Sequence, residues 1–149
     1  MSSRLPIGYI EVRVFAHATE DEEKVISSVR KILPDELSNS ATFQKKSLTG
    51  HYGNPIISLE TKLTDKQVLP LVLVKIGRNL DSLDKELLER EIKLHLEKRD
   101  LFLRFDKQAA ACSGDLKLSA LDPIHLKIHF KNKTTDEIVD LSRESGLLP

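Results

Sequence analysis

The sequence has little cysteine, few aromatic residues and no long hydrophobic run. Cys112 is its one cysteine, so an intramolecular disulfide is impossible, which is typical of proteins in the reducing cytoplasm. No apolar stretch approaches the roughly 20 residues that a membrane-spanning helix needs. Met1–Leu5 does not resemble the apolar core of a signal peptide. These absences predict a cytoplasmic protein that makes no contact with a membrane.

Motifs of the common enzyme classes are also missing. The sequence contains no glycine-rich phosphate loop, no dinucleotide-binding glycine pattern and no Gly-x-Ser-x-Gly elbow. His125 and His129 lie on one predicted strand about 13 Å apart, which is too far for them to share a metal ion. The four acidic residues at 20–23 are explained by the first turn of a helix, where the helix dipole favours negative charge. The sequence therefore predicts a non-catalytic protein without a metal or cofactor.

Charge is balanced overall but unevenly distributed. The 149 residues include 23 basic and 23 acidic side chains, whereas a strongly basic balance is the usual mark of nucleic-acid binding. Residues 41–79, however, carry six basic and two acidic side chains, and residues 101–133 carry six and three. Both blocks are predicted to be mainly strand and loop. The pattern is therefore compatible with a basic face on a neutral protein.

Hydrophobic periodicity predicts one α+β domain over residues 1–149. Alternating apolar and polar residues predict six strands, at 7–18, 41–48, 56–63, 101–106, 116–118 and 124–130. Helical spacing predicts four helices, which begin at Thr19, Thr64, Leu83 and Thr134. The order β-α-β-β-α-α-β-β-β-α favours a mainly antiparallel sheet with helices packed on one face. The other face of the sheet is expected to be open.

Some predicted helices have irregular features. Pro70 lies inside the second helix and predicts a kink or a late start, and Gly77-Arg78-Asn79 is predicted to break the helical pattern. The polar helix is predicted to cover residues 83–98, with His95 packed and hydrogen-bonded beside its apolar stripe. Residues 107–114 are predicted to form one helical turn that ends at its glycine.

Residues 48–57, Leu-Thr-Gly-His-Tyr-Gly-Asn-Pro-Ile-Ile, form an unusual connection between two predicted strands. Gly50 and Gly53 permit backbone angles that other residues avoid, and an Asn-Pro pair ends the turn. A two-residue turn would be enough to connect a hairpin. The longer loop displays His51, Tyr52 and Asn54, which suggests a role beyond connecting the strands.

RNA binding requires cations for phosphates, planar groups for bases, and amides for polar base edges. Two short segments supply such groups: Lys45, Lys46, His51, Tyr52 and Asn54 in the first, and Arg104, Lys107 and Gln108 in the second. The same residues also fit an ordinary exposed sheet whose hairpin tip packs against a helix. The residue types alone therefore leave RNA binding as one of several alternatives.

Four stretches carry a resemblance to a known family: Tyr9–Val25 (YIEVRVFAHATEDEEKV), Thr49–Ile56 (TGHYGNPI), Leu103–Ala110 (LRFDKQAA) and Asp122–Ile128 (DPIHLKI). They resemble the archaeal family of predicted RNA-binding proteins described as exosome subunits. The resemblance implies a fold like that of the large-subunit ribosomal protein that carries 5S rRNA. It also implies RNA as a partner, with exosome or ribosomal subunits as further partners. The positions that it implicates are His51, Tyr52, Gly53, Asn54, Arg104, Lys107 and Gln108.

The resulting hypothesis is a cationic surface on which the glycine loop and the 104–108 segment lie close together. Its phosphate ligands are Lys45, Lys46, Arg104 and Lys107. His51 and Tyr52 stack on a base or sugar, and Asn54 and Gln108 bind polar edges. One alternative is a protein-interaction module that docks the same loop on exosome or ribosomal components without touching RNA. Another is a hydrolase or nuclease in which Asp106 and Asp122 bind a metal ion.

Overall fold

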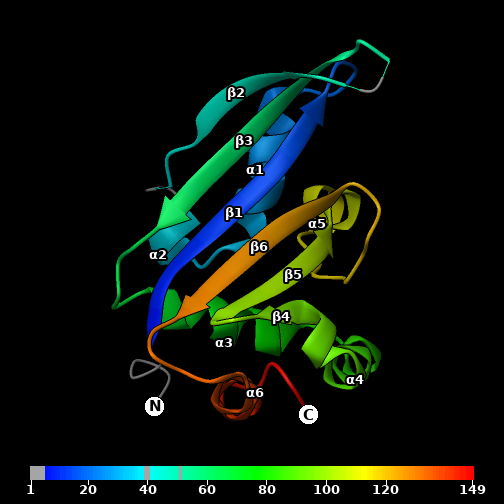
Figure 1. Ribbon diagram of the computed structural model, residues 1–149. Helices are drawn as coiled ribbons and strands as arrows, with labels where there is room; N and C mark the ends of the chain where they lie inside the picture. The colour runs from blue at the N-terminus through cyan, green and yellow to red at the C-terminus, as the bar shows by residue number, and fades with distance from the viewer. Residues whose placement is uncertain (1–5, 39–40, 51) are drawn as a thin grey trace.

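The computed structural model describes residues 6–38, 41–50 and 52–149, which build an α+β fold around one antiparallel sheet (Figure 1). The strands lie in the order β2-β3-β1-β6-β5-β4. Their bounds are β1 Ile7–His17, β2 Gln44–Thr49, β3 Pro55–Leu63, β4 Leu96–Glu97, β5 Asp100–Asp106 and β6 Pro123–Phe130. The helices are α1 Glu22–Ile32, α2 Asp35–Ser38, α3 Leu69–Asn79, α4 Ser82–Arg90, α5 Lys107–Ser113 and α6 Thr135–Glu144. The predicted fold class is confirmed.

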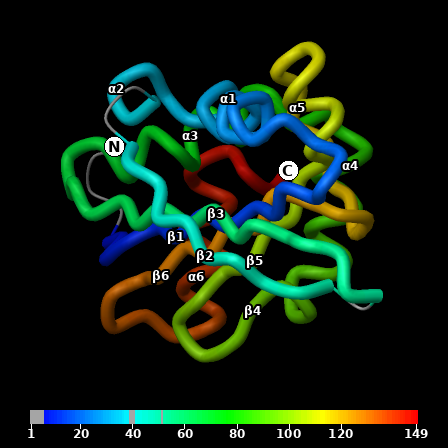
Figure 2. Tube along the Cα trace, turned by 90° about the horizontal axis from the view of Figure 1, so that it is seen from above, coloured from blue at the N-terminus to red at the C-terminus, as the bar shows by residue number. Residues whose placement is uncertain are grey.

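The core lies between the sheet and the helices. On β1, Ile10, Val12, Val14 and Ala16 are buried, because alternate residues of a strand point to the same side. Apolar side chains of α1 and α3 cover these strand residues: Val25, Val29, Ile32, Leu69, Val72, Leu73 and Ile76. Figure 2 shows α1, α2 and α3 together on one side of the central strands. We name this side of the sheet the helix face.

The opposite side of the sheet, which we name the open face, carries exposed side chains at its centre. Arg13, Glu60 and Lys62 are exposed on it, and Phe15 and Lys127 are half-buried. β1 crosses the middle of the sheet and pairs with both β3 and β6. Side chains from four neighbouring strands therefore form one continuous surface, as the sequence predicted.

The start of α1 differs from the prediction. Its cap is the carboxylate of Asp21, which accepts a hydrogen bond from the Glu23 N–H at 2.9 Å, so the helix begins at Glu22. Thr19, the predicted cap, lies in the turn between β1 and α1. Threonine and aspartate are both good N-caps, and the capping-box spacing alone predicted Thr19 instead of Asp21.

The bounds of α3 depend on a proline and a glycine. The helix begins at Leu69 rather than Thr64, and Pro70 occupies its first turn, where a missing N–H costs nothing. The late start was one of the two predicted outcomes. The helix ends at Asn79, within the predicted break at 77–79, and Gly77 itself is still helical. A Cβ at Gly77 would lie 2.9 Å from backbone atoms of Gly146. The glycine therefore permits the turn after α6 to pack directly on α3.

The predicted helix over 83–98 is wrong in its second half. α4 ends at Arg90, a 3₁₀ turn covers Ile92–His95, and the short strand β4 then pairs with β5. The i,i+4 apolar spacing continues through this change, so periodicity could not reveal it. His95 is hydrogen-bonded, as expected, with its Nδ1 atom 2.9 Å from the Phe102 carbonyl oxygen.

Two further predictions concern the end of the chain. The predicted strand at 116–118 reduces to one bridge between Leu118 and Phe105. The last helix is capped as predicted, because Thr134 and Glu137 bond to each other's backbone N–H groups. No helix among the described residues is long and apolar enough to cross a lipid bilayer.

Candidate nucleic-acid interface

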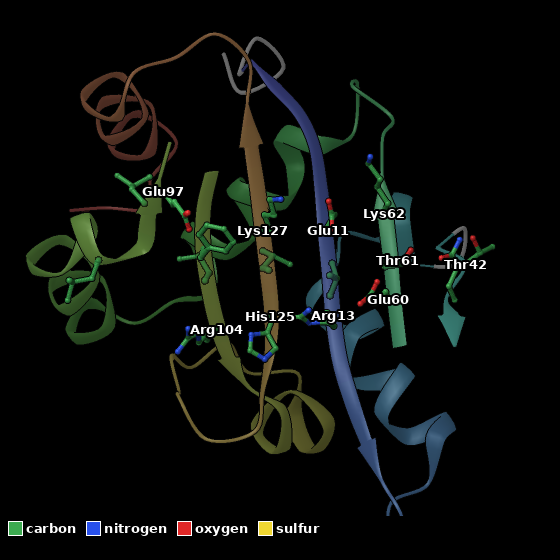
Figure 3. Close-up of a pocket in the computed structure, with 17 residues that line it drawn as sticks. Glu11, Arg13, Thr42, Glu60, Thr61, Lys62, Glu97, Arg104, His125 and Lys127 are labelled. Carbon is green, nitrogen blue, oxygen red and sulfur yellow. The ribbon is translucent and has the colours of Figure 1, made fainter. Parts of the chain in front are cut away.

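The open face contains a broad groove of about 960 Å³ (Figure 3). Its floor consists of residues from β3, β1, β6 and β5, and Leu94 and Glu97 stand at one side. Five cations contribute to this open face: Arg13, Lys46, Lys62, Arg104 and Lys127. The groove therefore combines several groups that can bind phosphate with the carboxylates of Glu11, Glu60 and Glu97.

Two arginines flank a histidine across three neighbouring strands. Arg104 of β5 is directly opposite His125 of β6, and His125 is directly opposite Arg13 of β1. Neighbouring strands are about 4.8 Å apart, so the three side chains lie next to one another across the sheet. Figure 3 shows them side by side. We name Arg104, His125 and Arg13 the arginine row.

The arginine row is not neutralised locally. Among the described residues, no carboxylate lies within 4 Å of the guanidinium of Arg13 or Arg104. The guanidinium of Arg13 lies 5.7 Å from the centroid of the Phe15 ring, and Glu60 of β3 is directly opposite Arg13 without forming an ion pair within 4 Å. Arg–phosphate contacts are charge-assisted and often bidentate. Two such groups without acidic partners form a surface suited to an anion.

His125 responds to these neighbours. Burial lowers the pKa of its imidazole below 6.5, and the charges of Arg13 and Arg104 lower it further, against a smaller opposite effect of Asp122. The ring packs edge-on against Phe15, with centroids 6.1 Å apart. These causes favour the uncharged form of His125 in the free protein, and its pKa rises when the surroundings become less positive.

A second cationic group surrounds Tyr9. The rings of Tyr9 and His129 are stacked with centroids 4.7 Å apart, and the Nζ atom of Lys62 lies 4.4 Å from the Tyr9 centroid. Burial disfavours the charged form of Lys127, but its hydrogen bond with Tyr9 and the charge of Asp100 outweigh this and raise its pKa. The Tyr9 ring thus already has a stacking partner. Lys62 and Lys127 remain at the surface as positive groups.

The two predicted lysines of β2 lie on opposite sides of the sheet. Lys45 is opposite Leu59 and forms an ion pair with Glu22 of α1, so it belongs to the helix face. The hydrogen bond and charge of Glu22 raise the pKa of Lys45. Lys46 is opposite Ser58 and is exposed on the open face. Of the pair, only Lys46 has a place on the same surface as the arginine row.

The glycine loop forms the tip of the β2–β3 hairpin, as predicted (Figure 1). The Gly50 N–H donates to the Asn54 carbonyl at 2.7 Å, and Gly53 adopts the left-handed conformation with φ +79°. The side chain of Tyr52 is 86% exposed, and Asn54 is exposed beside it. His51 lies outside the described residues. The tip is thus a small projection that displays an aromatic ring and an amide.

Lys107 does not fit its predicted role. Its side chain is 3% exposed, and three oxygen atoms surround its ammonium: Phe15 O at 2.9 Å, Glu20 Oε1 at 2.9 Å and Asp122 Oδ2 at 2.7 Å. An ammonium has three donors, and here each has a partner within the protein. Lys107 is therefore a structural cation that ties α5 to two loops, and the expectation that it holds a phosphate is corrected.

The other residues of the 104–108 segment also include both exposed side chains and structural ones. Arg104 is exposed on the open face, whereas Asp106 caps α5 by accepting a hydrogen bond from the Ala109 N–H at 2.9 Å. Gln108 is exposed in the first turn of α5. The Arg-x-Asp-Lys-Gln motif thus contains one surface cation, a helix cap and a buried cation.

Asp106 and Asp122, which the hydrolase alternative assigns to a metal ion, also have structural roles. His17, Glu20 and Asp122 offer ligand atoms within 4.8 Å of one another. However, the Lys107 ammonium already contacts both carboxylates, and the Nε2 atom of His17 lies 3.1 Å from Asp122. A cation of the protein itself thus occupies the centre of this cluster, and Asp106 serves as a helix cap.

The glycine loop and Arg104 do not form one compact site. Arg13 of the arginine row lies four residues before His17, and His17 is opposite Ile56 at the base of the hairpin. Four residues of strand correspond to about 13 Å. The open face joins the two regions instead, because Ser58 is opposite both Lys46 and Phe15. The structure therefore replaces a compact patch by an elongated surface.

Sequence reasoning missed several residues of this surface: Tyr9, Arg13, Lys62 and His125. A signal was present, because charged and aromatic residues alternate with apolar ones along β1 and β6. That alternation predicted an exposed face, but it did not reveal which strands are neighbours.

An antiparallel sheet with helices on one face, and with cations and aromatic rings on the other, is an architecture found in RNA-binding domains. Comparison with known proteins also indicates an RNA-binding protein. Residues 9–130 match the family model described as RNA binding. The chain is 31% identical over 134 residues to RNA-binding protein PAB1135 of Pyrococcus abyssi, which covers 88% of this chain and 86% of that protein. The chain therefore belongs to this archaeal family of RNA-binding proteins.

Solved structures support the same assignment. Mth689, a DUF54 protein from Methanothermobacter thermautotrophicus, is 31% identical with a TM-score of 0.77, over 93% of this chain and 97% of that one. SSO0741 from Sulfolobus solfataricus is 28% identical with a TM-score of 0.72, over 91% and 98% of the two chains. The fold described above is thus shared with members of the DUF54 group.

Proposed function

We propose that the protein binds RNA, without catalysis, along the open face of its sheet. The observation that carries this proposal is the arginine row, in which the strand register places His125 between two arginines that form no ion pair among the described residues. Lys46, Lys62 and Lys127 add positive charge to the same face, on which Glu11 and Glu60 also lie. Most of the binding energy is expected from phosphate contacts, which dominate RNA affinity in general.

The hairpin tip forms a second part of the proposed interface. Tyr52 is the most exposed aromatic ring among the described residues, and Asn54 provides an amide next to it. Within this proposal Tyr52 stacks on a base and Asn54 bonds to a polar edge, while Gln108 lies at the margin. His51 keeps its proposed role beside Tyr52, and Lys45 contributes only long-range charge because it is paired with Glu22.

The cellular role belongs to the same proposal. Association with the exosome or with ribosomal subunits, participation in RNA processing and a cytoplasmic location rest on the family resemblance described above. The likeness to the ribosomal protein that carries 5S rRNA stays a prediction. A protein-interaction module without RNA contact is the competing interpretation, and the salt dependence of binding distinguishes the two.

The test compares two triple variants that remove equal charge from opposite sides of the molecule. Arg13→Ala/Lys62→Ala/Arg104→Ala removes cations of the open face, and Lys24→Ala/Arg78→Ala/Arg90→Ala removes exposed cations carried by helices. Binding of a structured and an unstructured RNA is measured by fluorescence anisotropy at several salt concentrations. Circular dichroism establishes that both variants remain folded.

We expect the open-face variant to bind at least about tenfold more weakly, with a salt slope shallower by about 0.7–0.9 per lost phosphate contact. The helix-side variant should bind like the wild type. Equal affinities of the wild type and the open-face variant, or a loss limited to the helix-side variant, would contradict the proposal.

A further inference from the structure

Beyond the cationic surface, the arginine row has the geometry of a specific site. Its three side chains come from adjacent strands, so the antiparallel register fixes their spacing rather than a flexible loop. Arg13 and Arg104 are each one strand away from His125, and all three side chains line the same groove. An anion placed over His125 would be within reach of both guanidiniums.

Three basic and three acidic groups surround His125, and the two directly opposite it are arginines. From β1 it faces Arg13, with Glu11 one step further along the strand; from β5 it faces Arg104, with Asp106 one step further. On its own strand the neighbouring charged groups are Lys127 and, just before β6, Asp122. Two of these acids already have partners within the protein. Asp106 accepts a hydrogen bond from the Ala109 N–H, and Asp122 contacts Lys107 and His17.

We infer that the arginine row is a binding site for a phosphodiester group, and that His125 takes up a proton when this site is occupied. The inference rests on the proposed function, because it names the contact through which the open face holds RNA. Burial is the main cause that lowers the His125 pKa, and a phosphate between Arg13 and Arg104 offsets the part that comes from their charges. The protonated ring then adds a third charged donor to the same phosphate.

The direction of the pH effect follows from linkage. The free protein has a His125 pKa below 6.5, and the complex has a higher one. Affinity is therefore constant at high pH, rises as pH falls through the bound pKa, and becomes constant again below the free pKa. A pKa difference of one unit corresponds to about a tenfold gain in affinity.

The first experiment uses an oligouridylate of about eight nucleotides without terminal phosphates, because neither its bases nor its phosphodiesters titrate between about pH 5 and pH 8. Binding is measured over this range for wild type and for His125→Gln, and the pKa of each histidine is followed by NMR. His95→Gln and His129→Gln are the matched controls. Sulfate, which also does not titrate here, serves as a second probe of the anion site itself.

We expect the oligonucleotide and sulfate each to raise the pKa of His125. Wild-type affinity should rise about threefold to tenfold toward low pH. His125→Gln should lose this rise, whereas both control variants should keep it. Arg13→Gln/Arg104→Gln should abolish the effect of sulfate.

Two results overturn the inference. One is oligonucleotide binding to the open face with an unchanged His125 pKa, which would leave the proposed function intact. The other is an unchanged His125 pKa in sulfate, which would show that the row is no anion site. If sulfate raises the pKa but no RNA binds, the proposed function fails and the anion site remains.

Discussion

The ammonium of Lys107 and a carboxylate oxygen of Asp122 lie 2.7 Å apart. Lys107 is the first residue of α5, and Asp122 precedes β6, so the contact joins two connections at one end of the sheet. Glu20, from the turn between β1 and α1, contacts the same ammonium at 2.9 Å. The lysine of the Arg-x-Asp-Lys-Gln motif is therefore a structural residue that joins these connections.

Lys107→Met should destabilise the protein without a specific effect on RNA affinity. The variant leaves Glu20, Asp122 and the Phe15 carbonyl without their shared donor. Because both carboxylates are partly exposed, we expect a loss of about 1–3 kcal/mol in the free energy of unfolding, measured in urea. Gln108→Ala, one residue away and exposed, is the control and should leave stability unchanged. Unaltered stability with weakened RNA binding would restore the original phosphate role of Lys107.

Asp122 should make the protein more stable above about pH 4 than below it. Burial raises the pKa of its carboxyl, but the hydrogen bonds of Lys107 and His17 outweigh burial and hold the pKa below 3.8. A depressed folded pKa adds stability above the unfolded value, and this is lost as pH falls through the folded value. The difference in melting temperature between the wild type and Asp122→Asn should therefore shrink in acid. A difference independent of pH would contradict this assignment.

Gly77→Ala should destabilise the protein, although alanine normally favours a helix. At an ordinary helical position the change would gain up to about 1 kcal/mol. Here the added carbon would lie 2.9 Å from the Gly146 backbone, and overpacking of this kind costs about 1–3 kcal/mol. Urea unfolding measures the sign directly. A more stable Gly77→Ala variant would show that the turn after α6 can move away from α3.

Arg13→Gln and Arg104→Gln should each raise the pKa of His125 in the free protein toward 6.5. Each change removes one of the two positive charges that lower it, while burial remains. NMR titration of the imidazole gives the value, and Arg90→Gln on α4 is the control that should leave it unchanged. If neither arginine variant moves the pKa, burial alone controls the imidazole and the arginine row is not electrostatically coupled.

The sequence predicted the parts of the fold that depend on local pattern. Alternation on β1 identified its buried and open sides, and the capping box at Thr134 identified the last helix. The same pattern could not identify β4, because Leu88, Ile92 and Leu96 keep helical spacing across a change of structure. A local sequence pattern predicts a segment correctly only when its tertiary contacts favour the same secondary structure.

The candidate site was less accessible from the sequence, because it depends on strand register. Arg13, Arg104 and His125 are far apart in the chain and become neighbours only through the pairing of β1, β6 and β5. The burial of Lys107 could not be predicted, because nothing in the sequence distinguishes a buried lysine from an exposed one in a basic segment. The alternation of Lys45 and Lys46 was visible, and it implied opposite sides of the sheet from the start.

β2 is the outermost strand on its side of the sheet, and its outer backbone edge has no partner strand in the described part of the chain. Such an edge can recruit a strand from another molecule, and lysines are among the residues that discourage this. Lys45 and Lys46 therefore protect the protein against self-association, whatever else they bind. Replacing both with valine would convert the hairpin into a template for aggregation, so glutamine or serine is the safer substitution there.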